Sequence, residues 1–285
     1  MFSGYLLVAL AALLWGMIGP LSKLAIQEGM TPLEVAFWRA SMAWVLYAGH
    51  ALALRRVRVD LKDLPWVGLF GVACIFGLFA SYVLAVRAGG AALASVLLYT
   101  APAWVALLAW KFLKERMTAV KLIAVAATLA GVTGVSLGHG LDGPVNTTAI
   151  AMGLLSGLTY ALYYIFGKLL LGRYPTPTIF LYALPVGAAC MTPFFDFGPR
   201  SPAAWTACAV LAAMSTYGAY SLYYAGLRRI EASRAAVIAT LEPVVAALLA
   251  FSLFDERFTP LGYAGSALIL AAVLLTILGG RRPCT

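Results

Sequence analysis

Runs of apolar residues follow one another along nearly the whole chain, and short polar links separate them. In a helix, about 20 apolar residues are long enough to cross the roughly 30 Å of hydrocarbon in a bilayer. The pattern therefore predicts an all-α polytopic membrane protein with about ten transmembrane helices. The predicted spans are residues 4–26, 33–54, 64–86, 91–112, 118–137, 149–171, 177–195, 203–225, 232–254 and 260–279.

The composition excludes a soluble domain. Of the 285 residues, 63% are hydrophobic and 11% are charged, and the mean hydropathy is +0.92. A soluble domain carries about 25% charged residues, so this chain cannot cover a water-facing surface. The two histidines and four widely spaced cysteines form no zinc or disulfide pattern, so we expect no metal site and no cofactor.

The net charge of +9 is explained by where the basic residues stand. They gather in alternate links, which all fall on one side if the chain crosses the membrane back and forth. By the positive-inside rule this side is cytoplasmic, which places both termini in the cytoplasm and requires no nucleic-acid partner. The residues on this side are Arg55, Arg56, Arg58, Lys62, Lys111, Lys114, Arg116, Lys121, Lys168, Arg173, Arg228, Arg229, Arg234, Arg281 and Arg282.

The two halves of the chain repeat each other. Residues 82–118 align with residues 223–259, so that Pro102 in LLYTAPAWVALLAW meets Pro243 in IATLEPVVAALLAF. Each half holds five predicted spans, and an odd number makes the second half enter the membrane from the opposite side. We therefore expect a 5+5 inverted-topology repeat, with residues 1–141 and 142–285 as the two units. In transporters with this architecture, the substrate binds near the midplane where the repeats meet.

Several motifs resemble one membrane protein family. The first span carries Trp15–Gly16, the second has Arg39 in FWRA, and each half ends its proline-bearing span with Glu-Arg, at Glu115–Arg116 and Glu256–Arg257. With the repeat, this pattern resembles the EamA branch of the drug/metabolite transporter superfamily, closest to the bacterial YddG-type exporters of aromatic amino acids. The resemblance covers essentially the whole chain. It implies a ten-helix fold, a central cavity between the halves, and efflux across the bacterial inner membrane.

Glu242 is the one carboxylate deep inside a predicted span. It lies about ten residues into span 232–254, which is roughly 15 Å deep at 1.5 Å per residue. An ionised group at that depth needs water or a partner, so it either faces a cavity or is a protonated acid bonded to a neighbouring helix. In a cavity it could hold a substrate ammonium or take up a proton. Pro243 behind it, and Pro102 in the other half, each free a backbone carbonyl and disturb the helix, whereas Ala101 replaces the acid in the first half.

A second group of candidates is aromatic. A tyrosine hydroxyl has no partner in lipid, so deep tyrosines should face either a cavity or another helix. A cavity lined in this way would suit a solute with an apolar side chain. Arg39 lies about six residues into its span, and we expect it to act in structure or gating. The aromatic and hydroxyl candidates are Trp15, Tyr99, Tyr160, Tyr163, Tyr217, Tyr220 and Ser221.

The sequence favours a metabolite exporter that works by alternating access, with amino acids of apolar or aromatic side chain as the expected solutes. Its partners would be that small-molecule solute, membrane lipid and, for an active transporter, protons. Nucleosides or amphipathic cations are alternative cargoes. A channel is disfavoured because no charged ring or filter loop appears, and an intramembrane enzyme because G-x-S-x-G and H-E-x-x-H are missing.

Overall fold

The computed structural model describes residues 2–137, 141, 143–254 and 259–279, and these residues form helices and connecting links without any strand. Glu256, Arg257, His139 and the basic C-terminal residues lie outside the described residues. The α-helices are α1 (Phe2–Gly16), α2 (Ile18–Gln27), α3 (Pro32–Ala53), α4 (Leu64–Phe70), α5 (Gly77–Leu98), α6 (Ala101–Phe112), α7 (Ala119–Ser136), α8 (Thr147–Leu171), α9 (Thr176–Ala189), α10 (Pro202–Val210), α11 (Ala219–Leu227), α12 (Ala232–Ala239), α13 (Leu241–Phe254) and α14 (Pro260–Gly279). Two π-helices, η1 (Gly71–Phe76) and η3 (Leu211–Gly218), join α4 to α5 and α10 to α11, and a 3-10 helix, η2 (Thr192–Phe194), follows α9.

Seven helical stretches in the described residues are long and apolar enough to cross a membrane. They are Ser3–Gln27, Leu64–Leu98, Ala119–Ser136, Thr147–Leu171, Thr176–Phe194, Ala232–Leu249 and Pro260–Gly279. Each of the ten predicted ranges contains helix, but α6 is short and Leu64–Leu98 joins two predicted spans in one stretch. The multi-pass helical class is therefore shown, while the count of ten and the orientation of the termini stay predictions.

The joined stretch bends at a glycine. Gly90 has φ 84° and ψ 165°, a conformation that residues with a Cβ rarely adopt. Close to this bend, the side-chain amide of Asn146 donates to the carbonyl of Ala88 at 2.7 Å. The oxygen of the same side chain accepts the N–H of Ala149 and caps α8. One asparagine thus stabilises both the bend in α5 and the start of α8.

Irregular segments occur at matching places in the two halves. Extended towards the N-terminus without a gap, the alignment that pairs Pro102 with Pro243 also places η1 opposite η3. It pairs the break between α5 and α6, at Tyr99 and Thr100, with the break between α12 and α13 at Thr240. The first span is broken too, between α1 and α2 at Met17, whereas α8 is continuous.

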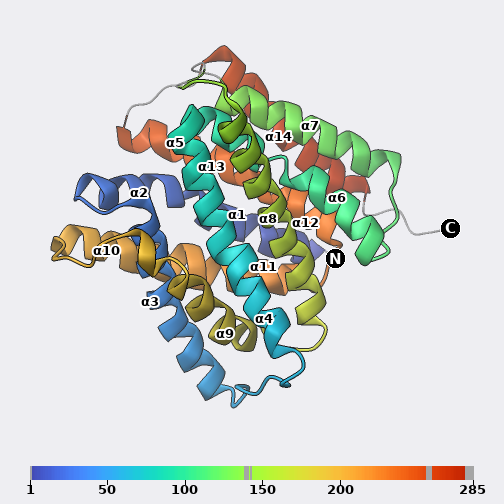
Figure 1. The fold of residues 1–285 in the computed structure, drawn as a ribbon. Helices are drawn as coiled ribbons and strands as arrows, with labels where there is room; N and C mark the ends of the chain where they lie inside the picture. The colour runs from blue at the N-terminus through green and yellow to red at the C-terminus, as the bar shows by residue number, and fades with distance from the viewer. Residues whose placement is uncertain (1, 138–140, 142, 255–258, 280–285) are drawn as a thin grey trace.

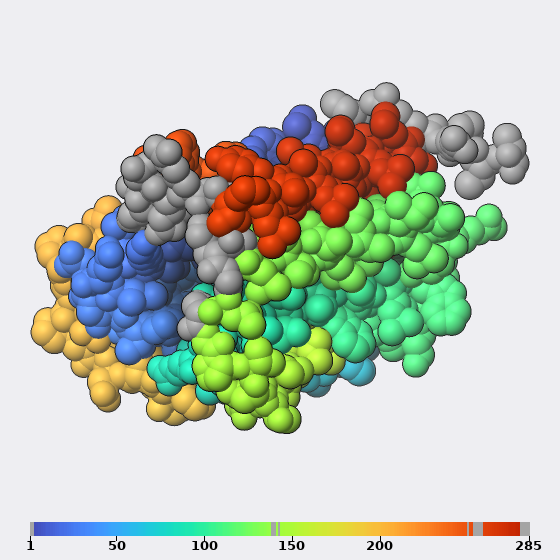
Figure 2. All heavy atoms as spheres, turned by 90° about the horizontal axis from the view of Figure 1, so that it is seen from above, coloured from blue at the N-terminus to red at the C-terminus, as the bar shows by residue number. Residues whose placement is uncertain are grey.

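Four helix pairings dominate the packing. α5 lies along α8 through the centre of the molecule, α3 lies along α9, and α1 lies along α11 (Figure 1). α7 and α14 lie side by side over one face (Figure 2). Glycines bring this last pair close together, because a Cβ on Gly131 would stand 2.7 Å from the carbonyl oxygen of Gly265 and 2.8 Å from Cγ1 of Ile269.

Substitution of Gly131 by Ala should destabilise the protein. The added methyl would force α7 and α14 apart, and overpacking of this kind costs about 1–3 kcal/mol of the free energy of unfolding. Gly68→Ala is the matched control, because a Cβ at Gly68 meets nothing within 4 Å. Thermal unfolding in detergent should show a lower Tm for Gly131→Ala and an unchanged or slightly higher Tm for Gly68→Ala. Equal Tm values for the two variants would contradict the close contact.

Candidate functional site

Glu242 lies in the first turn of α13, directly after the break at Thr240. Pro243 follows it in the same turn, where the missing proline N–H has no helical partner to lose. The N-terminus of a helix also carries a partial positive charge, which favours an acid there. Pro102 starts α6 in the same way, with Ala101 at the position that Glu242 takes in α13. Both prolines are buried.

Two tyrosines from other helices stand beside the Glu242 carboxylate. The hydroxyl of Tyr160, on α8, donates to Oε2 of Glu242 at 3.3 Å. Tyr99, at the break between α5 and α6, is a second neighbour of the same carboxylate. Glu242 and Tyr160 are partly exposed, whereas Tyr99 is buried. The carboxylate therefore has tyrosine neighbours from two other parts of the chain, and part of the surface of the Glu242 residue stays exposed.

Arg39 brings a positive charge close to the same place. Its side chain is 4% exposed, and its Cζ lies 4.7 Å from the ring centroid of Phe79. Glu34, five residues earlier on α3, pairs with Arg200 at 2.8 Å instead. The Arg39 charge acts on both Glu242 and Tyr220, yet no ion pair within 4 Å joins Arg39 to Glu242 among the described residues. A deep acid and a deep guanidinium thus lie near each other without a direct ion pair among the described residues.

A cluster of aromatic rings packs next to these charges. The ring centroid of Trp15, on α1, lies 5.1 Å from that of Tyr223 and 6.1 Å from that of Tyr220. Tyr163, on α8, lies 5.3 Å from Tyr220 and stacks on Phe70 at 5.7 Å. The hydroxyls of Tyr163 and Tyr223 are buried without a hydrogen-bond partner among the described residues. The cluster therefore presents apolar ring faces together with two hydroxyls, of Tyr163 and Tyr223, that have no hydrogen-bond partner among the described residues.

Tyr217 and Ser221 turn towards α3. The Tyr217 hydroxyl lies 2.9 Å from Nδ1 of His50, and the Ser221 hydroxyl lies 3.1 Å from that of Tyr47. These bonds favour a role in helix packing for both residues, which is one of the two alternatives that the sequence leaves open. The predicted residues that do come together are Glu242, Tyr160, Tyr99, Arg39, Tyr220, Trp15 and Tyr163, which we call the central group.

A partly buried ionic network joins the link after α6 to α7 and to the start of α12, at the predicted cytoplasmic end of the molecule. The Glu115 carboxylate accepts the backbone N–H of Ala232 at 2.6 Å and that of Ser233 at 3.3 Å, which caps α12. Lys121 lies 3.5 Å from Glu115 and 2.9 Å from Glu231. Glu115 therefore acts as a cap for the start of a helix from the other half of the chain.

Two features of the site region have no signal in the sequence. Lys168, which the sequence identifies only as one of the basic residues at the span ends, donates to the carbonyls of Leu227 and Ile230 and so caps the C-terminal end of α11. Phe79 contacts Arg39, and an apolar residue in an apolar run gives no hint of such a contact.

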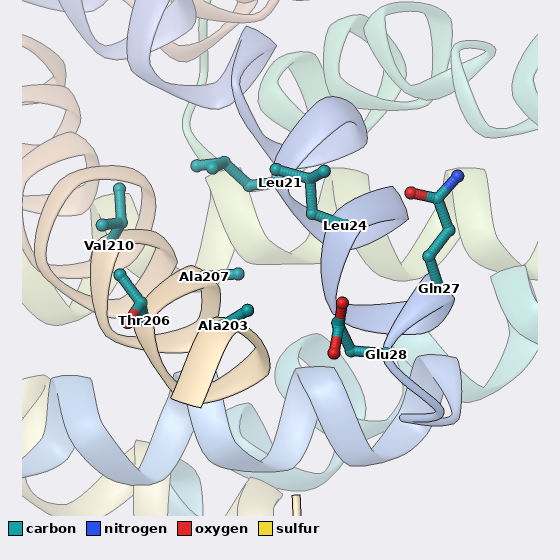
Figure 3. A pocket seen from close by; sticks show the side chains of 8 residues that line it. All are labelled: Leu21, Leu24, Gln27, Glu28, Ala203, Thr206, Ala207 and Val210. Carbon is teal, nitrogen blue, oxygen red and sulfur yellow. The ribbon is translucent and has the colours of Figure 1, made fainter. Parts of the chain in front are cut away.

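Two pockets open at the periphery. One, of about 350 Å³, lies between α2 and α10, where Leu21 and Leu24 face Ala207 and Thr206, with Glu28 at its edge (Figure 3). The other, of about 560 Å³, lies where α3, α8 and α11 end. Neither pocket is lined by a member of the central group.

Comparison with known proteins gives consistent matches over the whole chain. The model of the EamA-like transporter family matches residues 2–137 and 147–278. An uncharacterized transporter of Archaeoglobus fulgidus is 29% identical over 96% of this chain and 98% of its own. A protein of Streptantibioticus cattleyicolor named as a probable terminal-alkyne amino-acid exporter is 34% identical over 85% of this chain and 83% of its own. An uncharacterized inner membrane transporter of Salmonella typhimurium is 25% identical over 98% and 96%.

The fold is also shared with a solved structure. A crystal structure superposes with a TM-score of 0.83 over 99% of both chains, at 19% sequence identity. At this identity the match shows a common fold.

Replacement of Lys121 by Met should be strongly destabilising. It leaves the Glu115 charge buried without its ammonium partner, and breaking a buried pair costs about 3–5 kcal/mol of the free energy of unfolding. Lys62→Met removes an ion pair with Asp60 whose side chains are 74% and 68% exposed, and should cost less than about 1 kcal/mol. Denaturation of both variants in detergent measures the difference, and a Lys121→Met protein as stable as the control would show that the network carries no stability.

The pH dependence of stability should report on Asp63. Its carboxylate accepts the Tyr174 hydroxyl at 2.7 Å and Arg173 Nη1 at 2.6 Å, and these bonds lower the pKa of Asp63. A carboxyl with a lowered pKa stabilises the fold above its unfolded pKa and loses that contribution as pH falls through the folded pKa. The difference in Tm between wild type and Tyr174→Phe should therefore be constant above about pH 5 and shrink below about pH 4. A difference that stays constant down to about pH 2 would exclude Asp63 as its source.

Proposed function

This chain belongs to the EamA-like transporter family, and on that premise we propose that it exports α-amino acids with apolar or aromatic side chains by alternating access. The family and the several apolar helices make it a multi-pass membrane transporter. The observation that carries the choice of cargo is the central group, in which a carboxylate, a guanidinium and aromatic faces meet between helices.

The chemistry of a zwitterionic amino acid matches these three parts. Its ammonium would bind the Glu242 carboxylate, and its carboxylate would bind the Arg39 guanidinium, with Tyr160 and Tyr99 as further hydrogen-bonding groups. Its side chain would pack on the rings of Trp15 and its neighbours. A nucleoside or a cation would leave Arg39 without a counter-charge, because Glu34 is already paired with Arg200. The relative named as a probable amino-acid exporter supports the same class of cargo.

Alternating access is supported by the repeat. The family model matches two separate stretches, 2–137 and 147–278, which correspond to the proposed units 1–141 and 142–285. The paired π-helices and paired helix breaks lie at equivalent positions of the two units. The central group draws Glu242 from one unit and Arg39 from the other, so a rocking motion of the units would rearrange the site.

Export is the direction that the family resemblance implies, and we place both termini in the cytoplasm of a cell whose inner membrane holds the protein. The named inner membrane relative agrees with this location. In that orientation the network of Glu115, Lys121 and Glu231 closes the cytoplasmic end, and admission of substrate from the cytoplasm requires it to open. Glu242 is also the residue through which any proton coupling would pass, because it is the deep carboxylate of the site.

Counterflow in liposomes tests this proposal. Wild-type protein should exchange labelled phenylalanine saturably, with less exchange of threonine and none of a nucleoside. Glu242→Gln removes the charge that binds the ammonium and should lower exchange by about 10- to 100-fold, as expected for a lost charge-assisted hydrogen bond. Glu242→Gln should also abolish any acceleration of efflux by a pH gradient.

The matched control is Tyr217→Phe, which removes one hydroxyl that bonds to α3 rather than to the central group. It should keep phenylalanine exchange within about threefold of wild type, since a neutral hydrogen bond contributes little net energy. Exchange of the nucleoside but of no amino acid would refute the cargo. Exchange by Glu242→Gln at the wild-type rate would remove Glu242 from the site, and flux that never saturates would indicate a channel.

A further inference from the structure

The pocket at the ends of α3, α8 and α11 has a composition that the transport site does not explain. It holds about 560 Å³ and is lined by Leu54, Arg56, Leu171, Gly172, Arg173, Tyr174, Pro175 and Arg228. These residues close α3, join α8 to α9 and close α11, so the pocket lies where helices leave the apolar layer. No member of the central group lines it.

Its three arginines leave an excess of positive charge. Arg173 is paired with Asp63 at 2.6 Å. Arg228 donates to the backbone carbonyl of Tyr174 at 3.2 Å, which orients its guanidinium without neutralising it. Among the described residues, neither Arg228 nor Arg56 has a carboxylate within ion-pair distance. Two guanidiniums, of which Arg228 is oriented by the Tyr174 carbonyl, therefore share one pocket without a carboxylate within ion-pair distance among the described residues.

Apart from the arginines and the Tyr174 hydroxyl, the side chains of the lining are apolar, and they stand at the ends of the predicted spans 33–54 and 149–171. Leu54 is 51% exposed, and Leu171 and Pro175 complete the apolar walls beside the arginines. Apolar walls do not contribute to the binding of a small soluble anion. A phospholipid, in contrast, has a phosphate for the arginines and acyl chains that can contact the leucines. A volume of this size also accommodates a phosphate with its glycerol group.

We propose that this pocket binds the phosphate of an anionic phospholipid, with Arg56 and Arg228 as the phosphate ligands. Guanidinium groups match phosphate oxygens in geometry as well as in charge. The bound lipid would hold the end of α3 to the end of α11 through its headgroup. The proposal depends on the pocket alone and holds whichever solute the central group carries.

The test is lipid binding to delipidated protein in detergent, measured by native mass spectrometry. Phosphatidylglycerol should bind more tightly than phosphatidylcholine, and Arg56→Gln/Arg228→Gln should weaken phosphatidylglycerol by at least about tenfold, as expected for two lost arginine contacts at a membrane surface. The matched control is Arg58→Gln/Arg229→Gln, which removes the same charge from neighbouring exposed residues outside the pocket. It should bind within about twofold of wild type.

Equal weakening in both double variants would overturn the proposal, because it would show diffuse surface attraction. So would equal binding of the two lipids, or glycerol phosphate binding as tightly as the intact lipid, which would identify a site for a soluble phosphate. If the first variant does not fold, a photoreactive phosphatidylglycerol analogue on the wild-type protein decides the question. It should label residues 171–175, and labelling confined to other segments would contradict the site.

Discussion

A helix that breaks inside a membrane leaves backbone groups without partners, and the central group depends on how this protein meets that constraint. α12 ends at Ala239, and the hydroxyl of Thr240 turns back onto the carbonyl of Val237. The next helix then begins with Glu242 in its first turn, where the positive end of the helix dipole lies. The break therefore removes backbone hydrogen bonds, but it also creates a helix N-terminus whose positive dipole end stabilises the deep Glu242 carboxylate.

The same break in the other half has a different chemical result. α6 also begins after an interruption and carries a proline in its first turn, but Ala101 stands where the acid would be. The starts of α6 and α13 are thus equivalent in the two halves, but only the start of α13 carries an acid. The positive counterpart comes from Arg39 on α3, in the half that lacks the acid. The two halves therefore share one backbone arrangement, and single residue differences such as Ala101 and Glu242 make the region between them chemically asymmetric.

Much of this arrangement can be predicted from the sequence, because long apolar runs, prolines within them and a deep acid each favour one kind of local structure. The apolar runs predict the helices, and Pro102 and Pro243 predict the places where helices break. The faces of α11 could not be predicted in the same way. Tyr217 lies in the π-helix η3, whose wider turn changes the angular spacing to Tyr220, so α-helical counting assigns the two residues to one face. In the structure, Tyr217 instead hydrogen-bonds to His50, whereas Tyr220 packs in the aromatic cluster.

α12 is short, and its two ends are held by different parts of the protein. It has eight residues, about 12 Å of rigid helix. Glu115 binds its first backbone N–H groups, and Thr240 ends it next to the turn that carries Glu242. A rod of two turns does not absorb strain by bending, so a shift at either end must appear at the other. A displacement of the turn that carries Glu242 would therefore be transmitted through α12 to its Glu115 cap, which couples the helix break to one end of the protein.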